Sequence, residues 1–313
     1  MSNVKLETEI CGVKFKNPVI AASGTFGFGK EFGDFIDLNL LGGISVKGIT
    51  VEKRDGNPPP RIAETPSGIL NSVGLQNPGL DKFIKKEIPF LNNFDTKTIV
   101  NISGNLIEDY CIIAEKLSSE KIDMLELNVS CPNVKKGCLQ FGNSANGIYD
   151  IVSKVKKYCK QPLIVKLTPN VTDIKEIALS AQEAGADAIS LINTLLGMAI
   201  DINTKKPILK NNFGGLSGPA IKPIALRMTY EVANSVNIPV IGMGGIVSGD
   251  DAIEFLLAGA SAVMVGTYNF VTPTACIDVL HEIESYLENK GYNSIHDIIG
   301  KLELNYEKGG CEI

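Results

Sequence analysis

Short apolar runs alternate with amphipathic stretches along the whole of this 313-residue chain, and the alternation restricts the folds open to it. Eight of the runs are rich in β-branched residues and apolar on both faces, as parallel strands buried beneath helices are. These predicted strands are Pro18 to Ala22, Gly43 to Ile49, Thr98 to Ser103, Met124 to Val129, Leu163 to Leu167, Ala188 to Asn193, Val240 to Met243 and Ala262 to Gly266. Predicted helices alternate with them at Leu80 to Leu91, Ile107 to Leu117, Gly147 to Tyr158, Ile174 to Ala184, Ala220 to Val236, Asp250 to Leu257 and Pro273 to Leu287. A further helical pattern, Ser294 to Leu302, closes the chain.

This alternation predicts an α/β protein. Eight βα units within about 300 residues favour a (β/α)8 barrel, the TIM barrel. A doubly wound parallel sheet is the alternative, because it is built from the same units. No stretch rich in proline and glycine divides the sequence, so we expect a single domain over residues 1–313.

The composition argues against several classes of function. A net charge of −5 offers no basic surface, so we expect no nucleic-acid partner. No run of about 18 apolar residues occurs and the first residues lack the apolar segment of a signal peptide, so we expect a cytoplasmic protein without membrane association. The seven cysteines are odd in number and scattered, which predicts reduced thiols. With only two histidines in the chain, a protein-bound zinc ion or iron–sulfur cluster is not expected here.

Chemically distinctive residues lie at or just beyond the C-terminal ends of the predicted strands, where a (β/α)8 barrel carries its active site. In chain order they are Ser23, Lys47, Gly48, Asn101, Asn128, Lys166, Asn193 and Thr194. Glycines follow the last two strands, in Gly242-Met-Gly-Gly245 and Gly266-Thr267. Either glycine cluster alone is also typical of a tight turn. Because the loops after the seventh and eighth strands are the usual phosphate site of this fold, the two together predict phosphate binding.

The stretch Leu125 to Asn133 carries a candidate catalytic base. Asp123 to Val129 alternates at strand spacing and Pro132 ends the run, so Cys131 falls just beyond a strand end. A thiol there could remove a proton from a carbon acid while the amides of Asn128 and Asn133 hold a planar polar ring. The alternative is a small apolar residue lining a turn.

Two lysines lie inside predicted strands, where a buried ammonium is costly without a partner. Lys47 and Lys166 could extend toward solvent or pair with a carboxylate such as Glu126. Near a phosphate site, however, two cations favour an anionic ligand that carries another electron-rich group besides its phosphate. Flavin mononucleotide (FMN) is such a ligand.

Five segments in turn span nearly the whole chain: Asn71-Ser-Val-Gly-Leu-Gln-Asn-Pro-Gly79, Asn128-Val-Ser-Cys-Pro-Asn133, Ile192-Asn-Thr-Leu-Leu-Gly-Met198, Gly214-Gly-Leu-Ser-Gly-Pro-Ala220 and Gly242-Met-Gly-Gly-Ile246. In content and order they resemble the motifs of dihydroorotate dehydrogenases. The residues after Leu75 and after Thr194 resemble the catalytic subunit of the NAD-linked class 1B, with the fumarate-using class 1A as the alternative. Class 2 enzymes have a serine base and an N-terminal membrane segment, so Cys131 and the short N-terminal stretch before the first predicted strand lead us to expect that the chain is not of that class.

The resemblance implies oxidation of (S)-dihydroorotate to orotate in the biosynthesis of UMP. Cys131 would take the C5 proton, while the C6 hydrogen leaves as hydride to FMN on the opposite face. Side-chain amides suit this substrate because a uracil-like edge alternates hydrogen-bond donors and acceptors. The substrate-binding residues that the family implies are Lys47, Asn71, Ser72, Val73, Gly74, Leu75, Asn128, Asn133, Asn193 and Thr194.

The resemblance also implies an FMN site. Its residues would be Ser23, Lys47, Gly48, Asn101, Asn128, Lys166, Ile192, Gly218, Gly244, Gly245, Gly266 and Thr267. The sequence departs from the family at Gly137-Cys138, where relatives tend to have paired glycines in a segment that caps the active site. Cys138 thus adds a second thiol near Cys131.

Class 1B relatives pass electrons to NAD through a partner, an iron–sulfur flavoprotein subunit that carries FAD and a [2Fe-2S] cluster. We therefore expect a heterotetramer of two such subunits around a homodimer of this chain. Two other hypotheses remain open: a different FMN-dependent barrel enzyme, and a non-catalytic barrel that serves as a binding module. Reduction of a bound flavin by dihydroorotate would exclude both.

Overall fold

The computed structural model describes residues 4–130 and 141–305. Eight parallel strands form a closed barrel in the order β10-β15-β16-β3-β4-β7-β8-β9. Their bounds are β3 Val19–Ala21, β4 Gly43–Ser45, β7 Lys97–Ile102, β8 Met124–Asn128, β9 Leu163–Lys166, β10 Ala188–Leu191, β15 Val240–Met243 and β16 Ala262–Val265. Each corresponds to one of the eight predicted strands, so the (β/α)8 prediction is confirmed and the doubly wound sheet is wrong.

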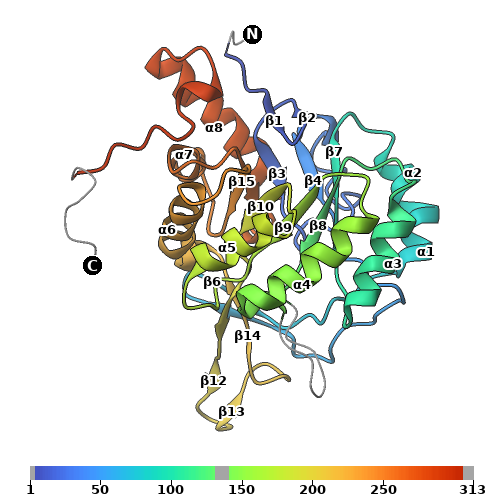
Figure 1. The fold of residues 1–313 in the computed structure, drawn as a ribbon. Coiled ribbons are helices and arrows are strands. Elements are labelled where there is room, and N and C mark those ends of the chain that lie inside the picture. The colour runs from blue at the N-terminus through green and yellow to red at the C-terminus, as the bar shows by residue number, and fades with distance from the viewer. Residues whose placement is uncertain (1–3, 131–140, 306–313) are drawn as a thin grey trace.

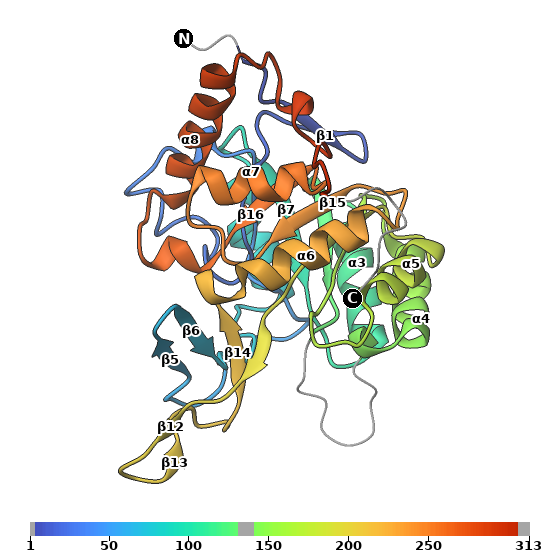
Figure 2. The ribbon, with the colours of Figure 1, turned by 90° about the vertical axis from the view of Figure 1, so that its left-hand side faces the viewer.

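Helices surround the barrel (Figures 1 and 2), because each βα unit brings the chain back over the outside of the sheet. The α-helices are α1 Leu80–Lys82, α2 Ile88–Leu91, α3 Ile107–Leu117, α4 Ala145–Val155, α5 Ile174–Glu183, α6 Lys222–Ala233, α7 Gly249–Leu257 and α8 Ala275–Lys290. The remaining helical turns are η1 Leu38–Leu40, η2 Phe83–Glu87, η3 Phe141–Asn143, η4 Lys156–Tyr158, η5 Pro219–Ile221, η6 Thr267–Phe270 and η7 Ile295–Asp297. Across the described residues, no helix has the length and apolarity needed to cross a membrane.

The strand β8 illustrates how the sequence divides between the two sides of the barrel wall. Leu125 and Leu127 point outward and join the large apolar cluster that includes the surrounding helices. Met124 belongs instead to a smaller apolar cluster inside the barrel. Glu126 and Asn128 follow Met124 at strand spacing, so they also face the interior. The barrel interior is therefore apolar near the N-terminal ends of the strands and polar toward their C-terminal ends.

An N-terminal hairpin covers the apolar end of the barrel. Strands β1 (Thr8–Ile10) and β2 (Val13–Phe15) pair antiparallel. Ile10 and Phe15 are fully buried against the inner apolar cluster. This end is thereby filled with side chains, which leaves the opposite end for a ligand.

At that opposite end the chain adds a second sheet that the sequence patterns did not predict. Its antiparallel order is β11-β14-β6-β5, and a two-stranded hairpin, β12–β13, projects beyond it (Figures 1 and 2). The bounds are β5 Ile62–Thr65, β6 Gly68–Asn71, β11 Leu195–Gly197, β12 Ile200–Asp201, β13 Lys206–Pro207 and β14 Gly214–Ser217.

The predicted helix at Ser294 to Leu302 is wrong. Only the single turn η7 forms, with Ser294 capping it through a hydrogen bond accepted from the backbone N–H of His296 at 3.2 Å. Gly300 then adopts a left-handed φ of 68°, which a helix cannot continue through. Ile295 and Ile298 are buried in the outer apolar cluster, whereas Leu302 is 46% exposed, so the apolar spacing reflects burial around one turn and not a helix.

Candidate active site

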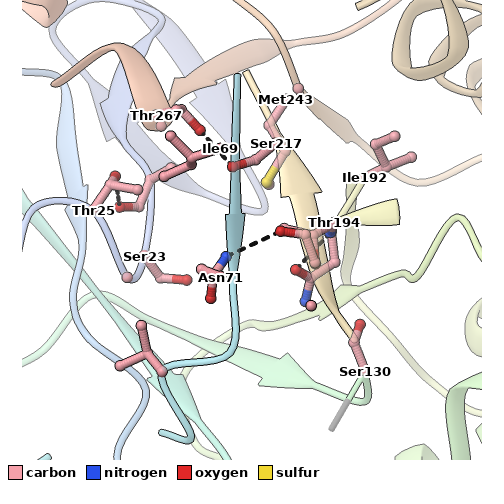
Figure 3. A pocket seen from close by; sticks show the side chains of 18 of the residues that line it. Ser23, Thr25, Ile69, Asn71, Ser130, Ile192, Thr194, Ser217, Met243 and Thr267 are labelled. Carbon is pink, nitrogen blue, oxygen red and sulfur yellow. Dashed lines mark hydrogen bonds between the residues drawn. The ribbon is translucent and has the colours of Figure 1, made fainter. Parts of the chain in front are cut away.

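A cavity of about 580 Å³ opens at the C-terminal end of the barrel, between the strand ends and the additional sheet. Figure 3 shows side chains from several strand ends and from the additional sheet around one open space. A cavity of this size matches those that bind cofactors and small substrates.

The structure brings the described candidate residues to this one cavity. It is lined by Ser23, Lys47, Gly48, Asn71, Ser72, Val73, Gly74, Leu75, Asn101, Asn128, Lys166, Ile192, Asn193, Thr194, Gly218, Gly244, Gly245, Gly266 and Thr267. Cys131, Asn133 and Cys138 lie outside the described residues. The individual role of each residue stays a prediction.

Side-chain amides form one polar wall of the cavity. The Nδ2 of Asn193 donates to Oδ1 of Asn128 at 3.5 Å, and that same oxygen accepts from the backbone N–H of Ser130 at 3.2 Å. Oδ1 of Asn193 in turn accepts from the backbone N–H of Thr194 at 2.8 Å. These bonds fix the direction in which each amide faces, so the wall presents an ordered set of donors and acceptors.

The loop after β6 forms a second wall. Gly74 and Leu75 both have left-handed φ angles, 77° and 55°, which turn the backbone sharply over the cavity. A side chain at Gly74 would also collide with Asn57, whose nearest atoms lie 2.6 to 2.7 Å from the ideal Cβ position. Asn57 holds the loop through an Nδ2 donation to the carbonyl of Ser72 at 2.8 Å. The loop therefore keeps backbone groups at the cavity edge.

Lys47 is a cation without a counter-charge in this site. Within the described residues no carboxylate oxygen lies within 4.0 Å of its ammonium. Burial lowers the pKa of Lys47 below its usual value, and the nearby cation of Arg61 lowers it further. An anion bound in the cavity would offset both effects, because an opposite charge favours the charged lysine.

Lys166 lies deeper in the site than Lys47 and is 5% exposed, so it does not reach solvent. Its Nζ donates to Oγ of Ser23 at 3.3 Å. The suggested pairing of a lysine with Glu126 does not occur, because no ammonium in the described structure lies within 4.0 Å of that carboxylate.

Glu126 is satisfied instead by neutral donors inside the barrel. Its two oxygens accept from Oγ of Ser45 at 2.9 Å, Nδ2 of Asn101 at 2.6 Å and Oγ of Ser190 at 2.8 Å. The carboxylate thus has hydrogen-bond partners without a lysine. The charges of Lys166, at the end of β9, and of Lys47, two residues beyond β4, are consequently left for a ligand.

The two glycine clusters follow neighbouring strands, β15 and β16, and both line the cavity. Gly244 and Gly245 have left-handed φ angles of 125° and 79°. An ideal Cβ on Gly245 would lie 2.7 to 2.9 Å from atoms of Lys222, so only glycine fits there. In Figure 3, the hydroxyl of Thr267 donates to that of Ser217 in the cavity wall, with 2.8 Å between the oxygens. Bare backbone beside hydroxyl groups is a chemically suitable site for a phosphate.

Several lining residues were missed by the sequence analysis. Most come from the additional sheet and its neighbouring loops, namely Asn57, Ile62, Ile69, Leu196, Asn211, Phe213, Gly215 and Ser217. No strand-end pattern marks them. The short segment Gly214 to Ala220 was noticed only through the family resemblance, and it does supply a strand, β14, to this wall.

Comparison with known proteins identifies the family. The family model described as "Dihydroorotate dehydrogenase" matches residues 5–287. The chain belongs to the dihydroorotate dehydrogenase family. A protein of Alkaliphilus metalliredigens is 59% identical over 302 residues, covering 96% of this chain and 100% of the relative. Relatives in Thermoanaerobacter pseudethanolicus and Bacteroides thetaiotaomicron are each 56% identical, with 96% of this chain covered and 100% and 99% of those proteins.

All three relatives carry the name "Dihydroorotate dehydrogenase B (NAD(+)), catalytic subunit". The family predicted from the sequence motifs is thereby confirmed. The similarity is to the class 1B, NAD-linked proteins, so the fumarate-using class 1A is not favoured.

The four described cysteines of this dihydroorotate dehydrogenase family member are free and lie away from the cavity. Burial raises the pKa of Cys11 to about 11 and the pKa values of Cys159 and Cys276 to about 12. Burial also raises the pKa of Cys111. These thiols stay protonated near neutral pH, and a buried protonated thiol is a poor base.

Proposed function

We propose that this chain oxidises (S)-dihydroorotate to orotate, with FMN as its cofactor, in the de novo biosynthesis of UMP. The observation that carries the proposal is one cavity that gathers the amide wall, two lysines without a carboxylate partner in the described structure, Lys47 and Lys166, and the two glycine loops. Family membership and the names of the relatives support the same reaction.

The residues present fit FMN. The flavin ring system needs a cation beside its N1 and C2 carbonyl edge, and Lys166 is a buried lysine with no carboxylate partner in the described structure. The phosphate needs backbone N–H donors, which Gly244, Gly245 and Gly266 offer. When bound, FMN would supply the hydride acceptor that no amino-acid side chain provides.

The substrate would be held by the chain's own polar groups. The amides of Asn71, Asn128 and Asn193 match the alternating donors and acceptors of the pyrimidine edge. Lys47 would face the carboxylate of dihydroorotate, and this negative charge would favour the protonated, charged form of the lysine. Cys131, outside the described residues, would accept the C5 proton. Asn133, also outside them, would complete the amide set.

The remaining proposals concern assembly. We propose that electrons reach NAD through an iron–sulfur flavoprotein subunit carrying FAD and a [2Fe-2S] cluster, in a heterotetramer built around a homodimer of this chain. The words "catalytic subunit" in the relatives' names support a partner of some kind. We further propose a cytoplasmic location, and a single domain over residues 1–313.

The first experiment tests whether dihydroorotate reduces a flavin on this chain. The purified protein is expected to be yellow, and its bound flavin to be FMN by chromatography after denaturation. Anaerobic addition of dihydroorotate should bleach the absorbance of the oxidised flavin. Protein that carries FMN but is not bleached would indicate a different FMN-dependent barrel enzyme, and protein that cannot bind FMN would indicate a non-catalytic module.

Replacing Lys166 by alanine is expected to lower the reduction potential of the bound flavin by about 30 mV or more, since a loss of about 1.4 kcal/mol corresponds to that shift for two electrons. The reason is that the reduced flavin gains negative charge at the edge that the ammonium would face. Equilibration with a redox dye measures the potential. Lys157→Ala, an exposed lysine beside α4, is the matched control and should leave the potential unchanged. A raised or unaltered potential in Lys166→Ala would place this lysine away from the flavin.

A further inference from the structure

The loop between β15 and α7, residues 244–248, rests on the first residue of a different helix. Gly245 packs so closely on Lys222 of α6 that an ideal Cβ would lie 2.7 Å from its Cβ and 2.8 Å from its backbone nitrogen. Residues 244–247 all line the cavity, whereas Lys222 does not. The position of this glycine loop therefore depends on where the start of α6 lies.

A carboxylate joins the same loop to the same lysine. Oδ2 of Asp251 accepts from the backbone N–H groups of Val247 and Ser248, at 2.9 and 3.1 Å. Its other oxygen, Oδ1, accepts from Nζ of Lys222 at 2.6 Å. Asp251 thus fixes the C-terminal half of the loop with one oxygen and ties it to α6 with the other.

The pair is strongly held at neutral pH. Burial is the largest single influence and opposes the charge on both groups, but the hydrogen bonds and opposite charges around them together outweigh it. The pKa of Lys222 is raised by Asp251 and Glu254, and the pKa of Asp251 is lowered by Lys222 and by the hydrogen bonds from Val247 and Ser248. Asp251 is 8% exposed, which limits screening of the pair by water and salt. Lys222 also donates to Oε1 of Glu254 at 2.9 Å, but within the described structure the Glu254 carboxylate accepts no hydrogen bond from the loop, and its side chain is 43% exposed. Asp251 is therefore the partner that matters for the loop.

We propose that Lys222 and Asp251 are positioning residues for the phosphate of FMN, because together they hold the 244–248 loop so that the backbone N–H groups of Gly244 and Gly245 stay at the cavity wall. The inference rests on the proposed FMN site and deepens it. Neither side chain needs to touch the cofactor. Their action is through the loop, so their loss should weaken recognition of the phosphate end alone and leave recognition of the flavin ring intact.

Competition between FMN and riboflavin separates these two ends, since riboflavin is the same ring system without the phosphate. Holoprotein is equilibrated with FMN and graded excesses of riboflavin, re-isolated, and its bound flavins are separated by chromatography. The measured quantity is the riboflavin-to-FMN ratio at which half of the bound flavin is riboflavin. Overall destabilisation weakens both flavins and cancels from this ratio.

Lys222→Met, which keeps the aliphatic stem over Gly245, is expected to lower this ratio about tenfold, the effect of losing one charge-assisted interaction. Lys222→Arg, which keeps the positive charge, should have a ratio close to that of the wild type. Glu254→Gln is the matched control and should keep the wild-type ratio, because it removes the lysine's other carboxylate without touching the loop. Should Lys222→Met not fold, Asp251→Asn decides by the same measurement.

Asp251→Asn also distinguishes two ways in which Lys222 could act: by positioning the loop, or by attracting the phosphate directly. If Lys222 acted on the phosphate through space, freeing it from Asp251 would strengthen the preference for FMN. Positioning predicts a weaker preference, by at least about threefold. A wild-type ratio in both Lys222→Met and Asp251→Asn, or a raised ratio in Asp251→Asn, would overturn this inference alone. Wild-type protein that binds neither flavin would overturn the proposed function instead.

Discussion

Cys131→Ala is expected to slow reduction of the bound flavin by dihydroorotate at least about a hundredfold, the usual scale for removal of a general base. Orotate should still bind, because the amide wall around Asn128 and Asn193 is unchanged. Anaerobic stopped-flow absorbance measures the reduction rate, and perturbation of the flavin spectrum by orotate measures binding. Near-normal reduction in this variant would remove Cys131 from the proposed role.

The same reaction should depend on pH through the thiol. An unperturbed cysteine has a pKa of about 8.5, so most of the thiol is protonated at neutral pH and cannot accept a proton. Reduction should therefore accelerate as the pH rises through the pKa of Cys131 in the complex and level off above it. Cys138→Ala should keep both the rate and this profile. A loss in Cys138→Ala comparable to that in Cys131→Ala would assign the base to the other thiol.

The barrel was predictable from sequence because its strands are defined by local composition. Strands buried on both faces, such as Leu163–Lys166, are continuous apolar runs, and the periodicity changes clearly at the helix that follows. Once the strands were predicted, the location of the site followed, since the C-terminal ends of parallel strands meet at one end of the barrel. For this reason the sequence alone predicted that Lys47, Lys166 and the glycine loops lie in one site.

The additional sheet could not be predicted in the same way. Ser217 of β14 lies opposite Ile69 of β6, so its pairing joins segments almost 150 residues apart, with four or fewer residues in each strand. Segments this short carry too little periodicity to distinguish a strand from a loop. The cavity wall that they build, including Asn57 and Phe213, was missed for that reason.

The sequence also could not predict the contact between Lys222 and Asp251 that supports the glycine loop. Lys222 and Asp251 lie 29 positions apart on different helices, and each taken alone is typical of a solvated helix surface. Only the fold shows that they meet beneath the glycine loop. Glu126 gives the opposite example, because a lysine partner was a reasonable expectation and three neutral donors take that place instead.

The chain purified alone is expected to pass electrons from dihydroorotate to an artificial dye but to form no measurable NADH. No strand in the sequence is followed by Gly-x-Gly-x-x-Gly, the motif that binds a dinucleotide at the start of a helix. Two near matches lack the third glycine: Gly242-Met-Gly244 has Val247 in its place, and Gly27-Phe-Gly29 has Phe32. In the fold, residues 27–32 lie in a loop of turns after β3, and no α-helix starts there. The sequence thus offers NAD no recognisable site of its own.

The measurement supplies dihydroorotate to the isolated chain and offers NAD, fumarate or a redox dye in turn, each followed spectrophotometrically. Dye reduction without NADH formation supports a separate subunit as the route to NAD, and adding the iron–sulfur flavoprotein should then restore NADH formation. The dye is the internal control, because it shows that the substrate half of the reaction is intact. Rapid NADH formation by the chain alone would overturn the proposed route. Fumarate as the best acceptor would mean that the chain uses the class 1A reaction, despite its similarity to NAD-linked relatives.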